Sequence, residues 1–200
     1  YYNDIAYCVD DGVEVDGTIA NTRVYRNRVY NCRAGMSLAP VFGGPCYIFR
    51  NEMFNIEDGF SAYKMNRSPA GLIIVHNTSN KISNGSSSPD GWQNTYFRNN
   101  IIMGTRYVFE EFGLVSGSVD DWDYNAYFSP RSATSGNEWF KWNNVRYASV
   151  GALAAGTSLE TNGIAIDMTD LNNATLPTTY ATGTVPGQRD LTLTNGSGAI

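Results

Sequence analysis

Four carboxylates near the start of the chain have a spacing that suggests chemistry: Asp10, Asp11, Glu14 and Asp16. Glu14 and Asp16 are two residues apart, so on a β-strand they would lie on one side, about 7 Å apart. Four carboxylates at one end of a groove could bind Ca²⁺, which takes about six to eight oxygen ligands. A carboxylate pair could instead hydrolyse a glycosidic bond. The alternative is that all four are solvated surface acids that hold turns.

His76 is the only histidine, and it directly precedes Asn77. Arginines precede asparagines at the corresponding places in neighbouring segments, namely Arg26, Arg50 and Arg98. This position favours a structural role for His76, as one of a column of equivalent residues stacked in successive segments. Catalysis by His76 is the alternative. The arginines are expected to be structural or to line a groove.

Alternation along the strands predicts which side chains face outward. Val13, Met36 and Phe60 are expected to point inward, which turns their neighbours toward solvent. The outward residues are Glu14 and Asp16, then Ser37 and Ala39, then Ser61 and Tyr63. Because these positions recur at similar spacing, we expect them to stack on one outer face that could bind a ligand.

Further along the chain, Arg106 and Glu110 lie where such a groove could continue. With Tyr63, Ser37 and Ser61 they are the candidate substrate-binding residues. Aromatic rings could also stack on sugars, and the candidates for that role are Tyr63, Tyr107 and Trp122. Packing in a core is the alternative for all three, because the chain is rich in aromatic residues.

A recurring unit has to position these side chains. Its marker is an asparagine that follows a short strand and recurs every 22 to 26 residues, at Asn27, Asn51, Asn77, Asn99 and Asn125. A repeat of about two dozen residues built from short strands, without a helical period, is typical of a solenoid. Asparagine tolerates a left-handed corner and can hydrogen-bond to its copies along a stack.

Apolar residues alternate within the units, as in Val13 and Val15 or Met36 and Leu38. One such strand cannot bury its apolar face alone, whereas equivalent strands stacked roughly 4.8 Å apart would form a continuous core. The sequence therefore predicts an all-β fold, a parallel β-helix of about five coils of roughly 24 residues.

The chain resembles the right-handed parallel β-helix repeat proteins of the pectate-lyase-like superfamily. The matching segments are residues 11–17 (DGVEVDG), 44–51 (GPCYIFRN), Lys64, 71–78 (GLIIVHNT) and 121–125 (DWDYN), within a region of about residues 8 to 128. The resemblance implies a right-handed coil. It is specific for the fold and weak for activity, because the fold carries lyases, hydrolases, epimerases and non-enzymatic adhesins.

The activity that the resemblance implies is β-elimination on an acidic polysaccharide. In such lyases a lysine or arginine abstracts the proton α to a uronate carboxyl while Ca²⁺ neutralises that carboxyl. Lys64 is the residue that would carry over as the base, with Glu14, Asp16 and His76 as further catalytic candidates. An ion pair with Glu57, Asp58 or a groove acid is the alternative for Lys64. The other function classes are a non-catalytic glycan-binding or structural surface β-helix, and a glycoside hydrolase.

The pattern changes after residue 129, so we expect residues 1–136 to form the β-helix and residues 137–200 to form an irregular cap within the same domain. A cap would cover the open end of the solenoid. Ser149 is expected to N-cap one short helix over residues 150–155. Residues 79–91, rich in serine and glycine, are expected to project as a loop.

The net charge of −5 and the pI near 4.8 argue against a nucleic-acid partner. No apolar run approaches the length of a membrane span. The chain begins at Tyr1, which we interpret as a mature or trimmed start, and composition and resemblance together favour an extracellular or cell-surface location. The sequence leaves open whether the protein is a monomer or assembles through its solenoid edges.

The cysteines are Cys8, Cys32 and Cys46. Cys8 and Cys32 are one coil apart, so they could lie stacked in adjacent coils and form a disulfide. Buried free thiols that act as small apolar side chains are the favoured alternative. The odd count and the lack of a CxxC pair argue against a zinc site.

Overall fold

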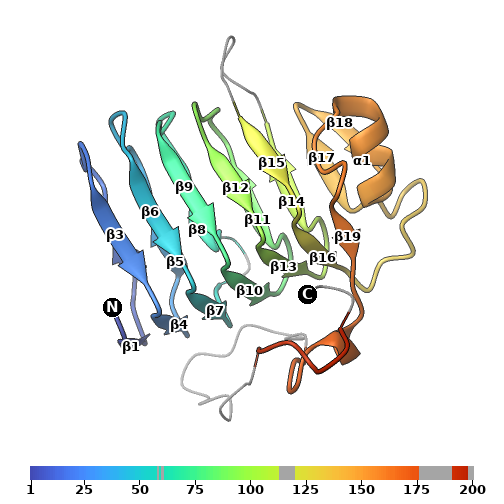
Figure 1. The fold of residues 1–200 in the computed structure, drawn as a ribbon, viewed down its shortest axis with the longest axis horizontal. Coiled ribbons are helices and arrows are strands. Elements are labelled where there is room, and N and C mark those ends of the chain that lie inside the picture. The colour runs from blue at the N-terminus through green and yellow to red at the C-terminus, as the bar shows by residue number, and fades with distance from the viewer. Residues whose placement is uncertain (58, 60, 113–119, 176–190, 198–200) are drawn as a thin grey trace.

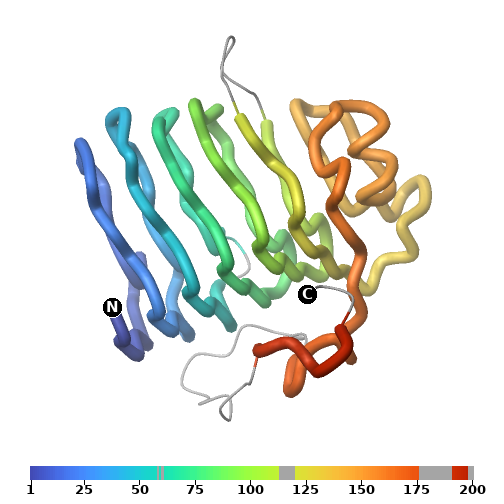
Figure 2. The backbone as a smooth tube through the Cα atoms, in the orientation of Figure 1, coloured from blue at the N-terminus to red at the C-terminus, as the bar shows by residue number. Residues whose placement is uncertain are grey.

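The computed structural model describes residues 1–57, 59, 61–112, 120–175 and 191–197. In this part of the chain, short parallel strands stack as about five turns of a β-solenoid (Figures 1 and 2). The predicted all-β class, the parallel pairing and the turn length of roughly 24 residues are confirmed. The turns follow one another along the long axis from the N-terminal end to a mixed α/β end (Figure 1).

Each turn contributes strands to three faces. The seven-stranded face consists of β1 (Asp4–Ala6), β4 (Arg28–Tyr30), β7 (Glu52–Phe54), β10 (Thr78–Lys81), β13 (Ile101–Gly104), β16 (Ala126–Phe128) and β19 (Ile164–Ala165). The five-stranded face consists of β3 (Thr22–Tyr25), β6 (Cys46–Phe49), β9 (Leu72–Val75), β12 (Tyr96–Arg98) and β15 (Asp121–Asp123).

The third face is made of two sheets. The first contains β2 (Asp11–Glu14), β5 (Ala34–Ser37) and β8 (Tyr63–Lys64). The second contains β11 (Ser86–Ser88), β14 (Phe109–Glu111), β17 (Phe140–Trp142) and β18 (Val145–Tyr147). β18 pairs antiparallel with β17, so the parallel stacking on this face ends there.

The interior is an apolar column whose side chains become larger toward the C-terminal end. On the five-stranded face the register aligns Val24, Ile48, Ile74, Phe97 and Trp122, and all five are buried. The rings of Phe97 and Trp122 stack with centroids 4.1 Å apart. Burial of such side chains stabilises the stack by roughly 1.5–3 kcal/mol each, which a single isolated strand could not achieve.

The α/β end covers the last turn, as a solenoid end requires. Helix α1 (Val150–Thr157) begins at Ser149, whose side chain accepts a hydrogen bond from the Ala152 amide, so the predicted N-cap is confirmed. Val150 and Leu153 pack into the main core. The segment after residue 137 is not only a cap, because β17 and β19 continue two of the parallel sheets.

A second apolar cluster lies on the outer side of the seven-stranded face, near its C-terminal end. Ile101, Met103 and Ala126 contact Ile166 and Leu171, which flank the short 3₁₀ helix η1 (Met168–Asp170). Leu171 pairs with Leu193 in an isolated bridge. The described C-terminal segment therefore lies back along the solenoid, as the red end of the tube in Figure 2 shows.

The projecting loop predicted for residues 79–91 is wrong. This stretch holds β11 and most of β10, and Lys81, Ser86 and Ser88 are fully buried. The hydroxyls of Ser86 and Ser88 find partners in a neighbouring turn: Ser86 Oγ lies 3.2 Å from Ser61 Oγ, and Ser88 Oγ donates to the Met65 carbonyl at 2.8 Å. No helix in the described part of the chain has the length and apolar character that crossing a membrane requires.

Candidate functional site

The corner between the five-stranded and seven-stranded faces carries a column of outward-pointing residues. One residue per turn adopts a left-handed backbone there, with φ between 55° and 59°, at Tyr2, Arg26, Arg50, His76, Asn99 and Tyr124. A left-handed residue between two strands turns the chain sharply. The next residue in each turn is a buried asparagine, or Asn3 in the first turn.

These asparagines form the ladder expected from the sequence. Its members are Asn3, Asn27, Asn51, Asn77, Asn100 and Asn125. Each amide oxygen accepts both the backbone N–H and the side-chain N–H of the asparagine in the preceding turn, as Asn77 Oδ1 does at 3.0 and 2.9 Å from Asn51. The second amide hydrogen of Asn77 reaches the Ile48 carbonyl at 2.9 Å. Each buried amide is thereby satisfied within the stack.

The column differs from the prediction at Asn99 and Arg98. Asn100 occupies the ladder, and Asn99 is the outward left-handed residue beside His76. Arg98 therefore lies one position earlier than Arg50, on β12, where it pairs with Val75 in register and its Nη2 lies 2.6 Å from Asp121. The sequence has two consecutive asparagines, Asn99 and Asn100, and the prediction aligned the first of them with Asn77. The whole fourth turn was therefore placed one residue out of register.

Glu160 closes the ladder at its C-terminal end. Its carboxylate accepts hydrogen bonds from Asn125 Nδ2 at 2.6 Å, the Asn125 amide at 3.3 Å and Tyr127 Oη at 2.7 Å. Burial raises the pKa of Glu160, and these hydrogen bonds oppose that rise. Nothing in the sequence indicated this role, because Glu160 follows α1 and lies outside the repeat.

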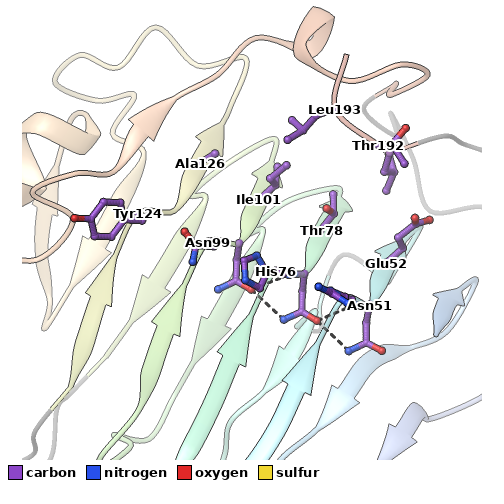
Figure 3. Close-up of a pocket in the computed structure, with 14 residues that line it drawn as sticks. Asn51, Glu52, His76, Thr78, Asn99, Ile101, Tyr124, Ala126, Thr192 and Leu193 are labelled. Atoms are coloured by element: carbon purple, nitrogen blue, oxygen red, sulfur yellow. Dashed lines mark hydrogen bonds between the residues drawn. The ribbon is translucent and has the colours of Figure 1, made fainter. Parts of the chain in front are cut away.

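A groove of about 560 Å³ runs along this corner. One wall carries the outward residues of consecutive turns, and the other carries Leu191, Thr192 and Leu193 of the C-terminal segment (Figure 3). Its floor includes the ladder amides, Thr78 and Ile101. Because it crosses turn after turn, the groove is parallel to the solenoid axis, with equivalent positions about 4.8 Å apart.

The corner wall of the groove carries a cationic and a protonatable side chain, although the chain is acidic overall. Arg50 and His76 are exposed and line it. Glu52 also lines it, but its carboxylate lies 3.4 Å from Arg28 Nε, which offsets its charge. Arg26 extends the column toward the N-terminal end and contacts the hydroxyl and ring of Tyr2.

The acidic residues near the N-terminus lie on the third face instead. Glu14 pairs with Ser37 in register, as predicted. Asp11 is bound by Lys64 Nζ at 2.7 Å, and Asp16 Oδ1 accepts from Ser37 Oγ and the Ala39 amide at 2.7 Å each. Asp16 thus braces the next turn, as the turn-holding alternative proposed.

The calcium site expected at Asp10, Asp11, Glu14 and Asp16 stays a prediction. In the described residues no three side chains among histidine, cysteine, aspartate and glutamate gather as a metal site. Asp11 Oδ2 is directed to Lys64 and Asp16 Oδ1 to the neighbouring turn, whereas Asp11 Oδ1 is buried without a hydrogen-bond partner.

Lys64 faces outward because the register on the third face differs from the prediction. Met36 pairs with Tyr63, and Ser37 pairs with Lys64. The expectation that Ser37, Ala39, Ser61 and Tyr63 face solvent is wrong, because Ser37 and Tyr63 are fully buried and the other two are nearly so. Ser61 Oγ donates to the Ser87 carbonyl at 2.8 Å, so it joins two turns.

The ion pair governs the chemistry of Lys64. The hydrogen bond to Asp11 raises the pKa of Lys64, and nearby Asp10 and Asp16 add to the effect. A general base needs a lysine whose pKa is lowered toward neutrality, so this environment opposes that role. The stability from the pair is present below the lysine pKa of the unfolded chain and is lost as pH rises through the raised value, so neutral pH retains it.

The Lys64→Met variant is expected to lower the free energy of unfolding by about 1–3 kcal/mol, because it leaves the buried Asp11 carboxylate without its cation. The double variant Lys64→Met/Asp11→Asn should recover part of that loss. Urea denaturation at neutral pH measures both. Equal stability of wild type and Lys64→Met would show that the pair contributes nothing.

Arg106 and Glu110 bind to each other and to neighbours. Glu110 is buried beneath Lys141 Nζ at 3.2 Å and Arg106 Nη1 at 3.7 Å. Tyr107 is nearly buried, with Arg106 over its ring at 4.8 Å. Trp122 is part of the core. For Tyr63, Tyr107 and Trp122 the packing alternative describes the structure.

Of the candidate catalytic and substrate-binding residues, the structure brings His76 into the groove. It lies there next to Arg50, one of the arginines expected to be structural or to line a groove. The residues missed from the sequence are Thr78, Tyr124, Thr192 and Leu193. Thr78 and Tyr124 could have been found from the repeat, since they flank ladder asparagines. The segment on the opposite wall, residues 191–193, does not belong to the repeat, so nothing in the sequence indicated that it lies at the corner.

Comparison with known proteins finds no matching family model, no matching curated protein and no matching solved structure.

Proposed function

We propose that this chain binds an acidic polysaccharide along the corner groove. The observation that supports the proposal is the column of Arg26, Arg50 and His76, which presents cationic or protonatable side chains at successive turns beside an open groove. A linear polymer with a regular spacing of carboxylates or sulfates matches a solenoid that repeats its own contacts. We also propose membership of the pectate-lyase-like superfamily and an extracellular or cell-surface location, which composition and resemblance favour.

The charge distribution supports an anionic over a neutral glycan. Guanidinium groups bind carboxylate or sulfate through paired, charge-assisted hydrogen bonds. A chain with a net charge of −5 would repel a polyanion elsewhere, so the local column selects where the polymer lies. Exposed contacts of this kind weaken with added salt. Amide and hydroxyl groups of Asn99, Thr78 and Thr192 would serve the sugar hydroxyls.

The Arg50→Glu variant is expected to weaken binding of an acidic polysaccharide at least tenfold, about 1.4 kcal/mol, because it puts a carboxylate in the groove. Arg33→Glu is the matched control: it changes the net charge equally on an exposed arginine that lies by Glu57, outside the groove lining. It should change affinity less than about twofold. Calorimetry with polygalacturonate, alginate and neutral dextran, at low and high salt, measures these effects.

Binding to one of the two anionic polymers that falls with salt and with Arg50→Glu supports the proposal. Equal losses with Arg33→Glu would indicate a diffuse charge effect and contradict it. Binding of dextran alone, or of no polymer, would also contradict it.

Cleavage of the same polymer is the second candidate, and the position of His76 beside Arg50 favours it. An arginine could hold a uronate carboxylate while an imidazole accepts the α-proton. Lys64, the base that the resemblance implies, lies on the third face and is paired with Asp11. Unsaturated product that His76→Ala abolishes and Lys64→Ala retains would establish elimination in the groove. New reducing ends without unsaturation would indicate hydrolysis.

A further inference from the structure

Cys8 and Cys32 occupy the same position in the first two turns. In the seven-stranded face Ala6 pairs with Tyr30, and each cysteine follows two residues later. The Arg33 amide donates to the Cys8 carbonyl at 3.2 Å, so the two chains stay in register past the strands. Both thiols are free in the structure, and Cys32 Sγ donates a hydrogen bond to the Tyr30 carbonyl at 3.3 Å.

The stacking gives these cysteines the separation that a disulfide needs. Neighbouring strands of a sheet lie about 4.8 Å apart, and disulfides span about 4.4–6.8 Å at Cα. Cys32 is fully buried, and Cys8 is half-buried beside it. Cys46 lies on β6 of the five-stranded face, where its register partners are Thr22 and Leu72.

We propose that Cys8 and Cys32 form a reversible disulfide that joins the first turn of the solenoid to the second. Oxidised glutathione, or another small disulfide, would be the oxidant. The Cys8 thiolate attacks it, forming a mixed disulfide and releasing one glutathione thiolate. Cys32 then attacks the Cys8 sulfur and releases the second. Two protein thiols and one small disulfide thus become one protein disulfide and two small thiols.

The exposures of the two sulfurs set the order of these steps. The half-buried Cys8 can meet the small disulfide from solvent, whereas Cys32 cannot. Burial raises the pKa of Cys32 to about 12. The thiolate is the attacking form, so closure by Cys32 is expected to be the slow step and to speed up as pH rises.

The bond would stabilise the least supported turn. β1, β2 and β3 are each the end strand of their sheet. Val9 is 92% exposed and Ile19 is 73% exposed. A crosslink that closes a loop of this size is expected to raise the melting temperature by about 6–12 °C. It would also hold Tyr2 against Arg26 at one end of the column. The inference does not rest on glycan binding.

The test is a thiol count on the wild-type chain after incubation with oxidised glutathione, with the reduced chain as reference. Alkylation under denaturing conditions and mass spectrometry should find one free thiol in the oxidised chain and three in the reduced chain. A peptide linking Cys8 to Cys32 should appear. The Cys46→Ser variant should retain the link and the thermal shift.

Three free thiols after oxidation, a link that includes Cys46, or glutathione that stays on Cys8 would each overturn the proposal. A Cys8–Cys32 link without a rise in melting temperature would overturn the stabilising role. The comparison within the wild-type chain requires no cysteine variant to fold.

Discussion

Replacement of Asn77 by alanine is expected to lower the free energy of unfolding by about 3–5 kcal/mol. Asn77 is in the middle of the ladder and is 1% exposed. Alanine would leave the Asn51 amide and one side-chain hydrogen of Asn51 without an acceptor, and the Ile48 carbonyl would lose a donor. Each buried polar group left unpaired costs about 1–3 kcal/mol, and apolar packing at this position recovers little of that.

Asn99→Gly is the matched control for this effect. It removes the same amide from the turn that follows β12, at an exposed position, and glycine accepts the left-handed backbone that Asn99 adopts. It should change the free energy of unfolding by less than about 1 kcal/mol. Urea denaturation compares the two variants, and amide hydrogen exchange at Asn51 reports the local break. Equal effects of the two substitutions would show that the ladder does not stabilise the fold.

The repeat made the solenoid predictable because its cause is local. A corner asparagine and an alternating strand are both visible in one turn, and the stack follows from copying them. The register of the third face was not predictable in the same way. Val13 pairs with Met36, but Met36 then pairs with Tyr63, three positions later than the alternation predicted, since the third turn is longer. Phe60, which was expected to point inward, lies outside the described residues. Alternation alone cannot locate an insertion between turns.

Polar residues misled the prediction for a related reason. Ser86, Ser88 and Lys81 have the composition of a loop, yet they are buried in or next to parallel strands. Their hydrogen-bond partners are groups in neighbouring turns or nearby backbone carbonyls. Lys81 Nζ, for example, donates to the Ile82 carbonyl at 2.7 Å. Whether a polar side chain can be buried depends on such partners, and these are set by stacking and not by the local sequence.

The candidate site was predictable only on one wall. Arg50 and His76 belong to the repeat, so their alignment followed from it, although the sequence favoured a structural role. The facing wall at Thr192 and Leu193 reaches the corner through the bridge between Leu171 and Leu193 and through the apolar cluster at Ile101. Those contacts join the repeat to a C-terminal segment that lies outside it, so the repeat pattern could not predict them.

The Glu160→Gln variant is expected to lower the free energy of unfolding by about 1–3 kcal/mol, the cost of one buried donor that loses its acceptor. Glutamine can keep an oxygen toward Asn125 Nδ2 and Tyr127, but its NH₂ group would then face the Asn125 amide, which is also a donor. Glu57→Gln is the control, because Glu57 is half-buried and its carboxylate lies 3.8 Å from the Arg33 guanidinium. Urea denaturation at neutral pH should separate the two.

The pH dependence of that difference tests the state of the carboxyl. Burial raises the pKa of Glu160 above its ordinary value of 4.5, so the native chain holds this proton more tightly than the unfolded chain does. The stability that comes from the group is then complete below the unfolded value and declines as pH rises through the folded value. The advantage of wild type over Glu160→Gln should therefore be larger at acid pH than at neutral pH. An advantage that grows with pH would mean that the three donors outweigh burial, and that the ladder ends on a carboxylate favoured in its charged form.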